Sequence, residues 1–188
     1  MDLSLSLDEK KFLIETSKKA ILFYFKNNDY PNYDQIAPKN LTKKGNCFVE
    51  LFLNGTLRGS MGNFNGDLSL IGSVVQNAIG AAFNDPRFPQ LSLMEFYKIK
   101  TSISLLSELT EISASDSNDL IKKFPKGYGI SMVSDKGRSL MLPHMWEKFP
   151  THEKFLSELS SKAGLPTDSW MDVKNKKFMI FESVFVKE

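Results

Sequence analysis

Hydrophobic residues recur with two different periods along the chain. In three segments they follow the three- and four-residue spacing of an amphipathic helix, so one face of each helix would be buried. We expect these helices over residues 7–26, from residue 67 or 69 to 83, and from Thr151 to Gly164. Ser6 with Glu9 forms a capping-box pattern at the start of the first helix, and Ser92 with Glu95 forms another before a short helix.

Strand-like runs fill much of the remaining chain. They are rich in apolar and β-branched residues, and turn residues separate them. We expect strands over residues 47–53, 56–61, 98–106, 127–133, 138–142 and 176–186. Asn54-Gly55 between the first two runs predicts a two-residue hairpin turn, because both turn positions need a positive φ. The sequence SDKG predicts a second hairpin, and residues 27–45 predict a long loop that is mobile or covers a cleft.

The first hairpin turn fixes which residues of its strands lie opposite each other. It places Leu51 opposite Arg58 and Val49 opposite Ser60, with Cys47 diagonally from Ser60. Arg58 and Ser60 would then share a largely apolar face, where a guanidinium and a hydroxyl each need a polar partner. We therefore predict that this face lines a pocket.

Two glycines of this hairpin, Gly59 and Gly62, leave the backbone uncovered. Bare backbone suits a bulge, a closely packed neighbour or a ligand that approaches the main chain, and the sequence leaves these alternatives open. A nucleotide-binding loop is not indicated, because the patterns GxGxxG and GxxxxGKS/T are both absent.

The composition limits the classes of protein to consider. A chain of 188 residues with 41% hydrophobic residues fits one domain, with room for a smaller lobe. Its 24 basic and 22 acidic side chains are spread along the chain and leave a net charge of +2, so nucleic-acid binding is not expected. No stretch of about 18 apolar residues occurs and the N-terminus lacks a basic export segment, so we expect a soluble protein without a membrane partner.

Cysteine and histidine are scarce. Cys47 is the single cysteine, and the two histidines are His144 and His152. Neither an internal disulfide nor a zinc site of the Cys/His type can be built from them, so we predict no metal site. A reduced cytoplasm fits this composition best. The sequence indicates no particular cofactor.

Arginine is also rare, because only Arg58, Arg87 and Arg138 stand among the 24 basic residues. In such a lysine-rich chain, an arginine indicates a position that needs the planar guanidinium group with its several N–H donors. That position is either a ligand site or a structural carboxylate, and both alternatives stay open. Arg87 stands between two prolines in DPRFPQLS, so we expect a stiff turn to hold it.

Six stretches, taken in order, carry a resemblance to a known family. They are CFVELFLNGTLRGSMGNFNG, AIGAAFNDPRFPQLS, SISLLSE, GYGISMV, GRSLMLPHMWE and FLSELSSKAGLPTDSW. In order and spacing they resemble the AMMECR-type family over nearly the whole chain. The resemblance implies an α+β fold with antiparallel sheets and flanking helices, in a single domain over residues 1–188. This domain would have two unequal lobes, the larger from both chain ends and the smaller from the middle, and a groove between them that contains LRGSMG.

The resemblance implies no reaction, because the family has no settled biochemical activity. Its members commonly occur beside, or fused to, a Memo-type domain, together with a radical-SAM protein. A shared pathway, and a Memo-type protein as a partner, are therefore implied by the resemblance alone.

Three positions depart from the family pattern. Ser60 stands where the family usually has the cysteine of LRGCIG, His144 where it reads LPQ, and Ser160 where it often has a cysteine before KAGL. A serine is a far weaker nucleophile than a thiolate unless a base activates it. Ser60 as nucleophile and His144 as base are the catalytic candidates, although no spacing argument brings them together. Cys47 either replaces the lost thiol or is a small buried residue.

Two functions from different classes remain. In the first, the groove binds a small anionic or polar molecule, as an enzyme or as a carrier. The ligand-binding residues that we predict for it are Arg58, Gly59, Ser60, Gly62, Arg87 and His144. In the second, the domain docks another protein and catalyses nothing.

Overall fold

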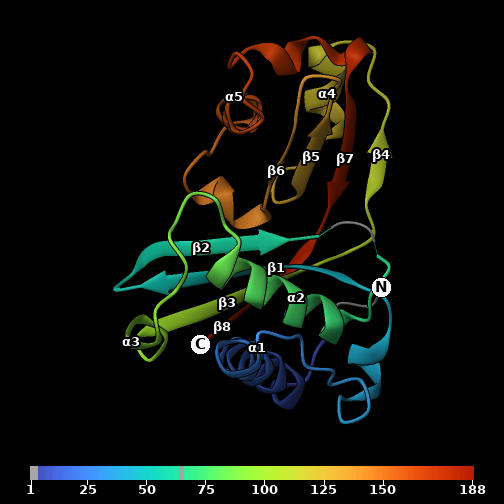
Figure 1. Cartoon of the computed structure of the whole chain (residues 1–188). Helices are drawn as coiled ribbons and strands as arrows, with labels where there is room; N and C mark the ends of the chain where they lie inside the picture. Colours follow the sequence, from blue (N-terminus) through green and yellow to red (C-terminus); the bar gives the residue numbers. More distant parts are fainter. Residues whose placement is uncertain (1–3, 64–65) are drawn as a thin grey trace. The chain divides into compact units, whose positions relative to one another are not determined.

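Two four-stranded antiparallel sheets organise the chain and give it an α+β fold, which confirms the predicted fold class (Figure 1). The computed structural model describes residues 4–63 and 66–188. The chain divides into two units, one of Met1–Leu106 with Val184–Glu188 and one of Ser107–Ser183. The first unit thus contains both ends of the chain, and the second is a continuous segment.

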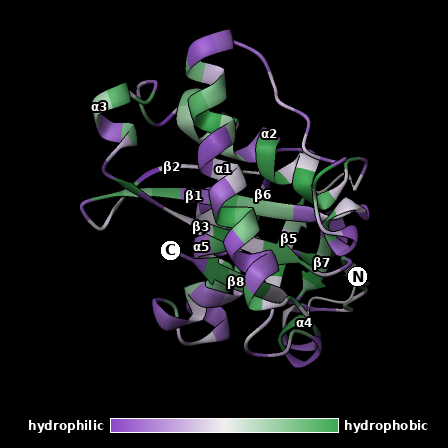
Figure 2. Ribbon diagram, turned by 90° about the horizontal axis from the view of Figure 1, so that it is seen from below, coloured by the Kyte–Doolittle hydropathy of each residue, from purple (hydrophilic) through white to green (hydrophobic). Residues whose placement is uncertain are grey.

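The first unit is built on the sheet with strand order β2-β1-β3-β8. Its elements are α1 (Leu7–Asn27), η1 (Lys39–Thr42), β1 (Asn46–Leu53), β2 (Thr56–Gly62), α2 (Leu70–Phe83), α3 (Leu93–Phe96), β3 (Ile99–Leu106) and β8 (Ser183–Lys187). Helices α1 and α2 pack on the sheet and on each other. In Figure 2 α2 is largely green, whereas purple and green alternate along α1, which exposes one side. Cys47, Val49 and Leu51 of β1 are fully buried in the core.

The second unit is built on the sheet with strand order β4-β7-β5-β6. Its elements are β4 (Thr110–Ile112), α4 (Ser117–Lys123), β5 (Gly129–Val133), β6 (Arg138–Met141), η2 (Pro143–Glu147), α5 (His152–Lys162), η3 (Ser169–Met171), η4 (Val173–Asn175) and β7 (Lys177–Phe181). Its core is aromatic, and the rings of Trp146 and Phe155 stack at 4.3 Å. The predicted hairpin between β5 and β6 is confirmed.

The helix starts form at the predicted caps. Glu9 N–H donates to Ser6 Oγ at 3.1 Å and Ser6 N–H donates to Glu9 Oε2 at 2.8 Å, so the first capping box is complete. The Ser92–Glu95 box is also complete, and Thr151 caps α5. Each cap depends on residues three apart, which is why the sequence alone predicts it.

The expected single strand over residues 176–186 is wrong. The chain instead forms β7 and β8, which belong to different sheets. Glu182 separates them, because its N–H donates to Ser107 Oγ and its carbonyl accepts from Ser107 N–H, each at 2.9 Å. The apolar pattern continues through both strands and therefore does not reveal this break.

No helix in the described part of the chain combines the length and the apolar character needed to cross a membrane.

Candidate functional site

The β1–β2 hairpin has the predicted turn. Asn54 and Gly55 have φ values of 52° and 80°, in the left-handed region that the turn requires. Leu53 lies opposite Thr56, as a two-residue connection demands.

A β-bulge at Arg58 changes the register beyond the turn. The extra residue shifts the pairing by one, so Ser60 lies opposite Glu50 instead of Val49. The predicted pairing of Arg58 with Leu51 is wrong for the same reason. Because successive strand residues face opposite sides of a sheet, Ser60 lies on the face opposite to the buried Val49 and Leu51.

Close packing explains both glycines of the LRGSMG motif. A Cβ atom on Gly59 would overlap the carbonyl group of Ala81 in α2, and one on Gly62 would overlap the ring of Phe48 on β1. Gly59 also follows the bulged residue directly. Of the alternatives that the sequence left open, the bulge and the packed neighbour are both present.

Arg58 forms a nearly buried ion pair with α3. Its Nε and Nη2 atoms donate to Oε1 and Oε2 of Glu95 at 2.8 and 3.1 Å, and Nη2 also reaches the Gln90 carbonyl at 3.4 Å. The Arg58 side chain is 9% exposed and that of Glu95 28%. The hydrogen bonds from Arg58 lower the pKa of Glu95 to about 2. Arg58 therefore joins β2 to the capping box of α3. Of the two alternatives for a rare arginine, a ligand site or a structural carboxylate, Arg58 has the second.

Asp85 connects the LRGSMG motif on β2 with the DPRFPQLS motif that follows α2. Its Oδ2 atom accepts from the backbone N–H of Ser60 at 2.8 Å and from Arg87 Nη2 at 2.7 Å. Its Oδ1 atom accepts from the Nε and backbone N–H groups of Arg87 at 2.9 and 3.1 Å. Burial alone would raise the pKa of Asp85, but these hydrogen bonds outweigh burial and hold it below its ordinary value.

The same contacts fix the orientation of Arg87. The Asp85 side chain is only 3% exposed, whereas that of Arg87 is 54% exposed. The hydrogen bonds from Arg87 to Asp85 raise the pKa of Arg87, so it stays charged. One edge of the guanidinium is thus bound to the protein and the other is open to solvent.

Ser60 shares its face of the sheet with two polar residues. Glu50 pairs with Ser60 on one side and with Ser102 on the other, so the three form a row across β2, β1 and β3. Ser102 Oγ donates to Glu50 Oε2 at 3.4 Å. The charge of Glu50 is the smallest of the causes that raise the pKa of Arg87. No residue in the described part of the chain hydrogen-bonds to the Ser60 hydroxyl.

The single thiol is on the other face. Cys47 is fully buried beneath α2, where Asn77 Nδ2 lies 3.5 Å from its sulfur, and burial raises the pKa of Cys47 to about 12. A thiol with that pKa is not a nucleophile at neutral pH. Cys47 is therefore the small buried residue of the two alternatives, and it does not replace a thiol at position 60.

The structure brings together only part of the predicted site. Asp85 links Ser60 with Arg87, Arg58 is directed to Glu95, and His144 lies in η2 of the second unit. Asp85, Glu50 and Glu95 are residues of this region that the sequence did not indicate as site residues. The signal for Asp85 was its position two residues before Arg87, the spacing at which an aspartate side chain binds its own turn.

Metal-ligating side chains do not cluster. Over residues 4–63 and 66–188, no group of three His, Cys, Asp or Glu side chains is placed to hold a metal ion.

Comparison with known proteins shows the family of the chain. A family model described as AMMECR1 matches residues 14–185 of the chain. The chain belongs to the AMMECR1 family.

Relatives and a solved structure agree with this AMMECR1 assignment. A protein of Methanocella arvoryzae is 30% identical, and the match covers 96% of this chain and 92% of that one. A protein of Saccharolobus islandicus is 34% identical over 89% of this chain and 78% of its own length. The fold is similar to the crystal structure of the uncharacterized protein PH0010 from Pyrococcus horikoshii, with a TM-score of 0.89, 27% identity, and coverage of 98% of this chain and 93% of that one.

Ser160 is one of the positions at which this AMMECR1 chain was expected to depart from its family. It is fully buried in α5, and its Oγ atom accepts from the backbone N–H of Trp170 at 3.1 Å. Ser160 therefore anchors η3 to α5 and is structural. Ser60, another of these positions, bonds Asp85 through its backbone N–H.

Proposed function

We propose that the first unit binds a small anionic or polar molecule beside Asp85, where Ser60 and Arg87 meet. One observation carries this proposal. A single Asp85 oxygen accepts from both Ser60 N–H and Arg87 Nη2, so a half-exposed guanidinium shares this oxygen with the main chain of Ser60, whose hydroxyl no described residue bonds.

The arrangement favours binding for a physical reason. A surface arginine normally loses side-chain entropy when it orders around a ligand, and the contacts with Asp85 have already ordered Arg87. Two of its donors bind Asp85, and its outer donors are available for a planar anionic group. Glu50 nearby adds an acceptor and disfavours a multiply charged anion. The ligand that we propose therefore carries one anionic group and at least one hydroxyl or amine donor.

The proposal concerns binding and includes no reaction. A serine nucleophile needs a base within hydrogen-bond reach, and the pairing of Ser60 with His144 stays a prediction because the two lie in different units. The groove between two lobes of one domain and the pathway shared with Memo-type and radical-SAM proteins also stay predictions. A cytoplasmic location is part of the proposal, supported by a lone buried thiol that has no second cysteine to pair with.

A thermal-shift screen tests this proposal. Wild-type protein, Arg87→Ala, Arg87→Lys and the matched exposed control Arg138→Ala are each melted with a series of hydroxy monocarboxylic acids and amino acids, which carry one anionic group and a hydroxyl or amine donor. We expect at least one of these probes to raise the Tm of wild type and of Arg138→Ala, and to leave that of Arg87→Ala unchanged. Arg87→Lys should recover only part of the shift, because a lysine lacks the fork of donors. The proposal fails if Arg87→Ala keeps the full shift or if no probe stabilises wild type.

A second function, docking of another protein, is favoured by a different surface. A hollow of about 530 Å³, lined by apolar and charged side chains, lies between the start of α1 and the edge strand β8. Its wall includes Leu7 and Phe185, which are 85% and 44% exposed. Exposed apolar side chains beside a sheet edge are typical of protein-docking surfaces. We propose a Memo-type protein as this partner.

Co-sedimentation with the Memo-type protein of the same genome tests the docking proposal. Phe185→Glu should abolish the complex, because it replaces an exposed apolar side chain of the hollow with a charge. Phe23→Glu, on the exposed side of α1, is the matched control and should leave the complex intact. Equal binding by wild type and Phe185→Glu would remove this surface from consideration.

A further inference from the structure

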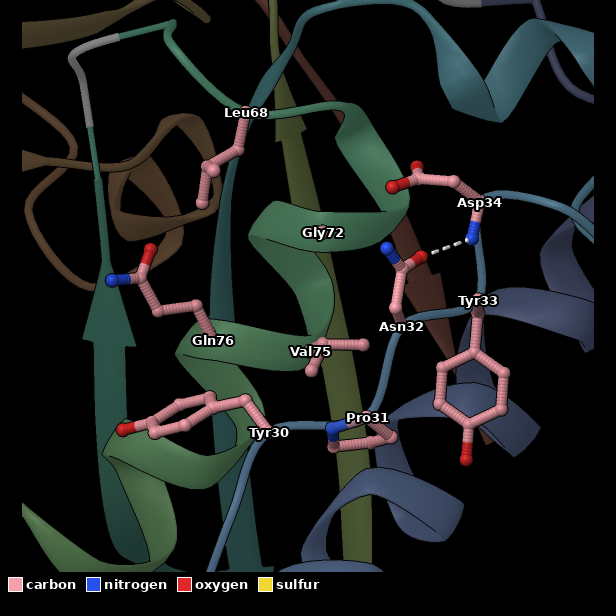
Figure 3. Close-up of a pocket in the computed structure, with 9 residues that line it drawn as sticks. All are labelled: Tyr30, Pro31, Asn32, Tyr33, Asp34, Leu68, Gly72, Val75 and Gln76. Carbon is pink, nitrogen blue, oxygen red and sulfur yellow. Dashed lines mark hydrogen bonds between the residues drawn. The ribbon is translucent and has the colours of Figure 1, made fainter.

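Two neighbouring hollows flank α2, and Tyr30 and Gln76 line both of them. The hollow drawn in Figure 3, of about 340 Å³, lies beside the first turns of the helix. The second, here called the edge hollow, has about 230 Å³ and lies between α2 and strand β2. In Figure 3 the amide of Gln76 extends from α2, and the ring of Tyr30 from the loop that follows α1, toward β2.

The main chain of Gly62 offers a donor and an acceptor to the edge hollow. Strand β2 is at the edge of its sheet, and Gly62 lies opposite Phe48. Asn63 N–H donates to the Cys47 carbonyl at 3.3 Å, which marks the Phe48–Gly62 pair as the type that does not exchange hydrogen bonds. The N–H and C=O groups of Gly62 therefore point away from β1, on the side of the sheet edge where Gly62 lines the hollow.

Asn77 adds a second acceptor whose orientation the protein fixes. Its Nδ2 donates to the Cys47 carbonyl at 3.0 Å and to Asn63 Oδ1 at 2.9 Å. A carbonyl can only accept, so the amide cannot turn over without setting two oxygens against each other. Asn77 is 2% exposed and lines the hollow, and no donor in the described part of the chain reaches its Oδ1 atom. An acceptor that the protein leaves without a donor is satisfied only by a ligand or by water that enters the hollow.

The remaining wall selects the charge, shape and size of a ligand. Among the described residues that line the edge hollow, none carries a charge, and the polar ones are Tyr30 and four side-chain amides. The ring of Tyr30 meets that of Tyr24 edge to face at a centroid distance of 5.6 Å, and Tyr30 is still 47% exposed, so part of its ring surface is available to a ligand. A volume of about 230 Å³ is smaller than the roughly 300–1,000 Å³ of sites for drug-sized ligands, and it suits one small ring system.

We propose that the edge hollow binds an uncharged, planar, nitrogen-containing ring of the nucleobase class. The ring stacks on Tyr30, and its edge places a donor and an acceptor against the C=O and N–H groups of Gly62. A ring N–H or amino group donates to Asn77 Oδ1, and the amide of Gln76 closes the site. Amide side chains and aromatic rings are the groups with which proteins read single bases. Neither Arg87 nor the Ser60 hydroxyl takes part, so this inference does not rest on the proposed anion site.

Saturation-transfer NMR with free adenine, hypoxanthine, cytosine and uracil at roughly millimolar concentration tests the inference. These probes carry no anionic group, so a failure of the anion screen leaves this test intact. We expect at least one base to bind wild type, and Tyr30→Ala to weaken that binding tenfold or more. Tyr30→Phe should retain it, because the stacking face remains. Gln76→Ala should weaken binding roughly fivefold, and the exposed control Gln35→Ala should leave it unchanged.

Three results would overturn the inference. The first is that no base binds wild-type protein. The second is that Tyr30→Ala binds the base as well as Tyr30→Phe does, because the ring then takes no part. The third is that ribose or glucose, used as uncharged non-planar probes, binds more tightly than every base.

Discussion

Arg58 and Arg87 make the same contact in opposite surroundings. Each donates its Nε and Nη2 atoms to the two oxygens of one carboxylate. For Arg58 the arginine is the buried partner and Glu95 is partly exposed, whereas for Arg87 the carboxylate of Asp85 is buried and the arginine is half exposed. The guanidinium of Arg58 is therefore committed to the fold, and that of Arg87 can still meet a ligand. Both arginines form an ion pair, so the pair itself does not separate the structural role from the ligand-binding role. The burial of the arginine side chain separates them.

Removal of Arg58 gives the largest expected effect. Arg58→Ala should lower the free energy of unfolding by about 3 kcal/mol, because it removes a nearly buried side chain and leaves the Glu95 carboxylate with only its hydrogen bonds from Ser92. Arg58→Lys should restore only part of this loss, since a point charge cannot form both hydrogen bonds. Urea unfolding measures the change, with Arg138→Ala as the control. A loss below about 1 kcal/mol would show that the buried pair is no stronger than a surface one.

The pH dependence of stability also tests the Arg58–Glu95 ion pair, and its expected effect is smaller than that of Arg58→Ala. Folding lowers the pKa of Glu95 from 4.5 to about 2, so its contribution is complete above pH 4.5 and is lost as the pH falls toward 2. Between those limits wild type should lose about 1–2 kcal/mol more than Glu95→Gln, a figure that allows for the partial exposure of Glu95. Urea unfolding of both proteins across this range measures the difference. A constant difference would mean that Glu95 has no lowered pKa.

Removal of Arg87 should change stability least. Arg87→Ala should cost about 1 kcal/mol or less, because Asp85 keeps the backbone N–H groups of Ser60 and of residue 87 as donors. Thermal and urea unfolding of the same preparation measure this change. If the loss matched that of Arg58→Ala, Arg87 would also be a structural residue, and the contrast between the two arginines would disappear.

The sequence predicted the features that depend on near neighbours. The Asn54-Gly55 turn and the Ser6–Glu9 capping box each involve residues at most three apart. The bulge at Arg58 was not predictable in this way. It accompanies a contact with Glu95, 37 residues later, and the close approach of α2 to Gly59.

The candidate site was predictable only in part, because some of its features depend on residues far apart in the sequence. The rarity of arginine drew attention to Arg87, and the local turn that holds it was expected. The one-residue register shift then moved Ser60 to the other face of the sheet, because a strand alternates its side chains with a period of two. The break at Glu182 depends on Ser107, 75 residues away, and likewise leaves no local signal.

The pairing of Ser107 with Glu182 has a consequence for the order in which the protein is made. The segment between them is one continuous unit whose two ends are bonded to each other, so every strand of its sheet is present once the segment has been synthesised. The sheet of the other unit needs β8, which is translated only after the whole of this segment. Strands β1, β2 and β3, although synthesised before the segment, therefore receive their fourth strand only after it has been made.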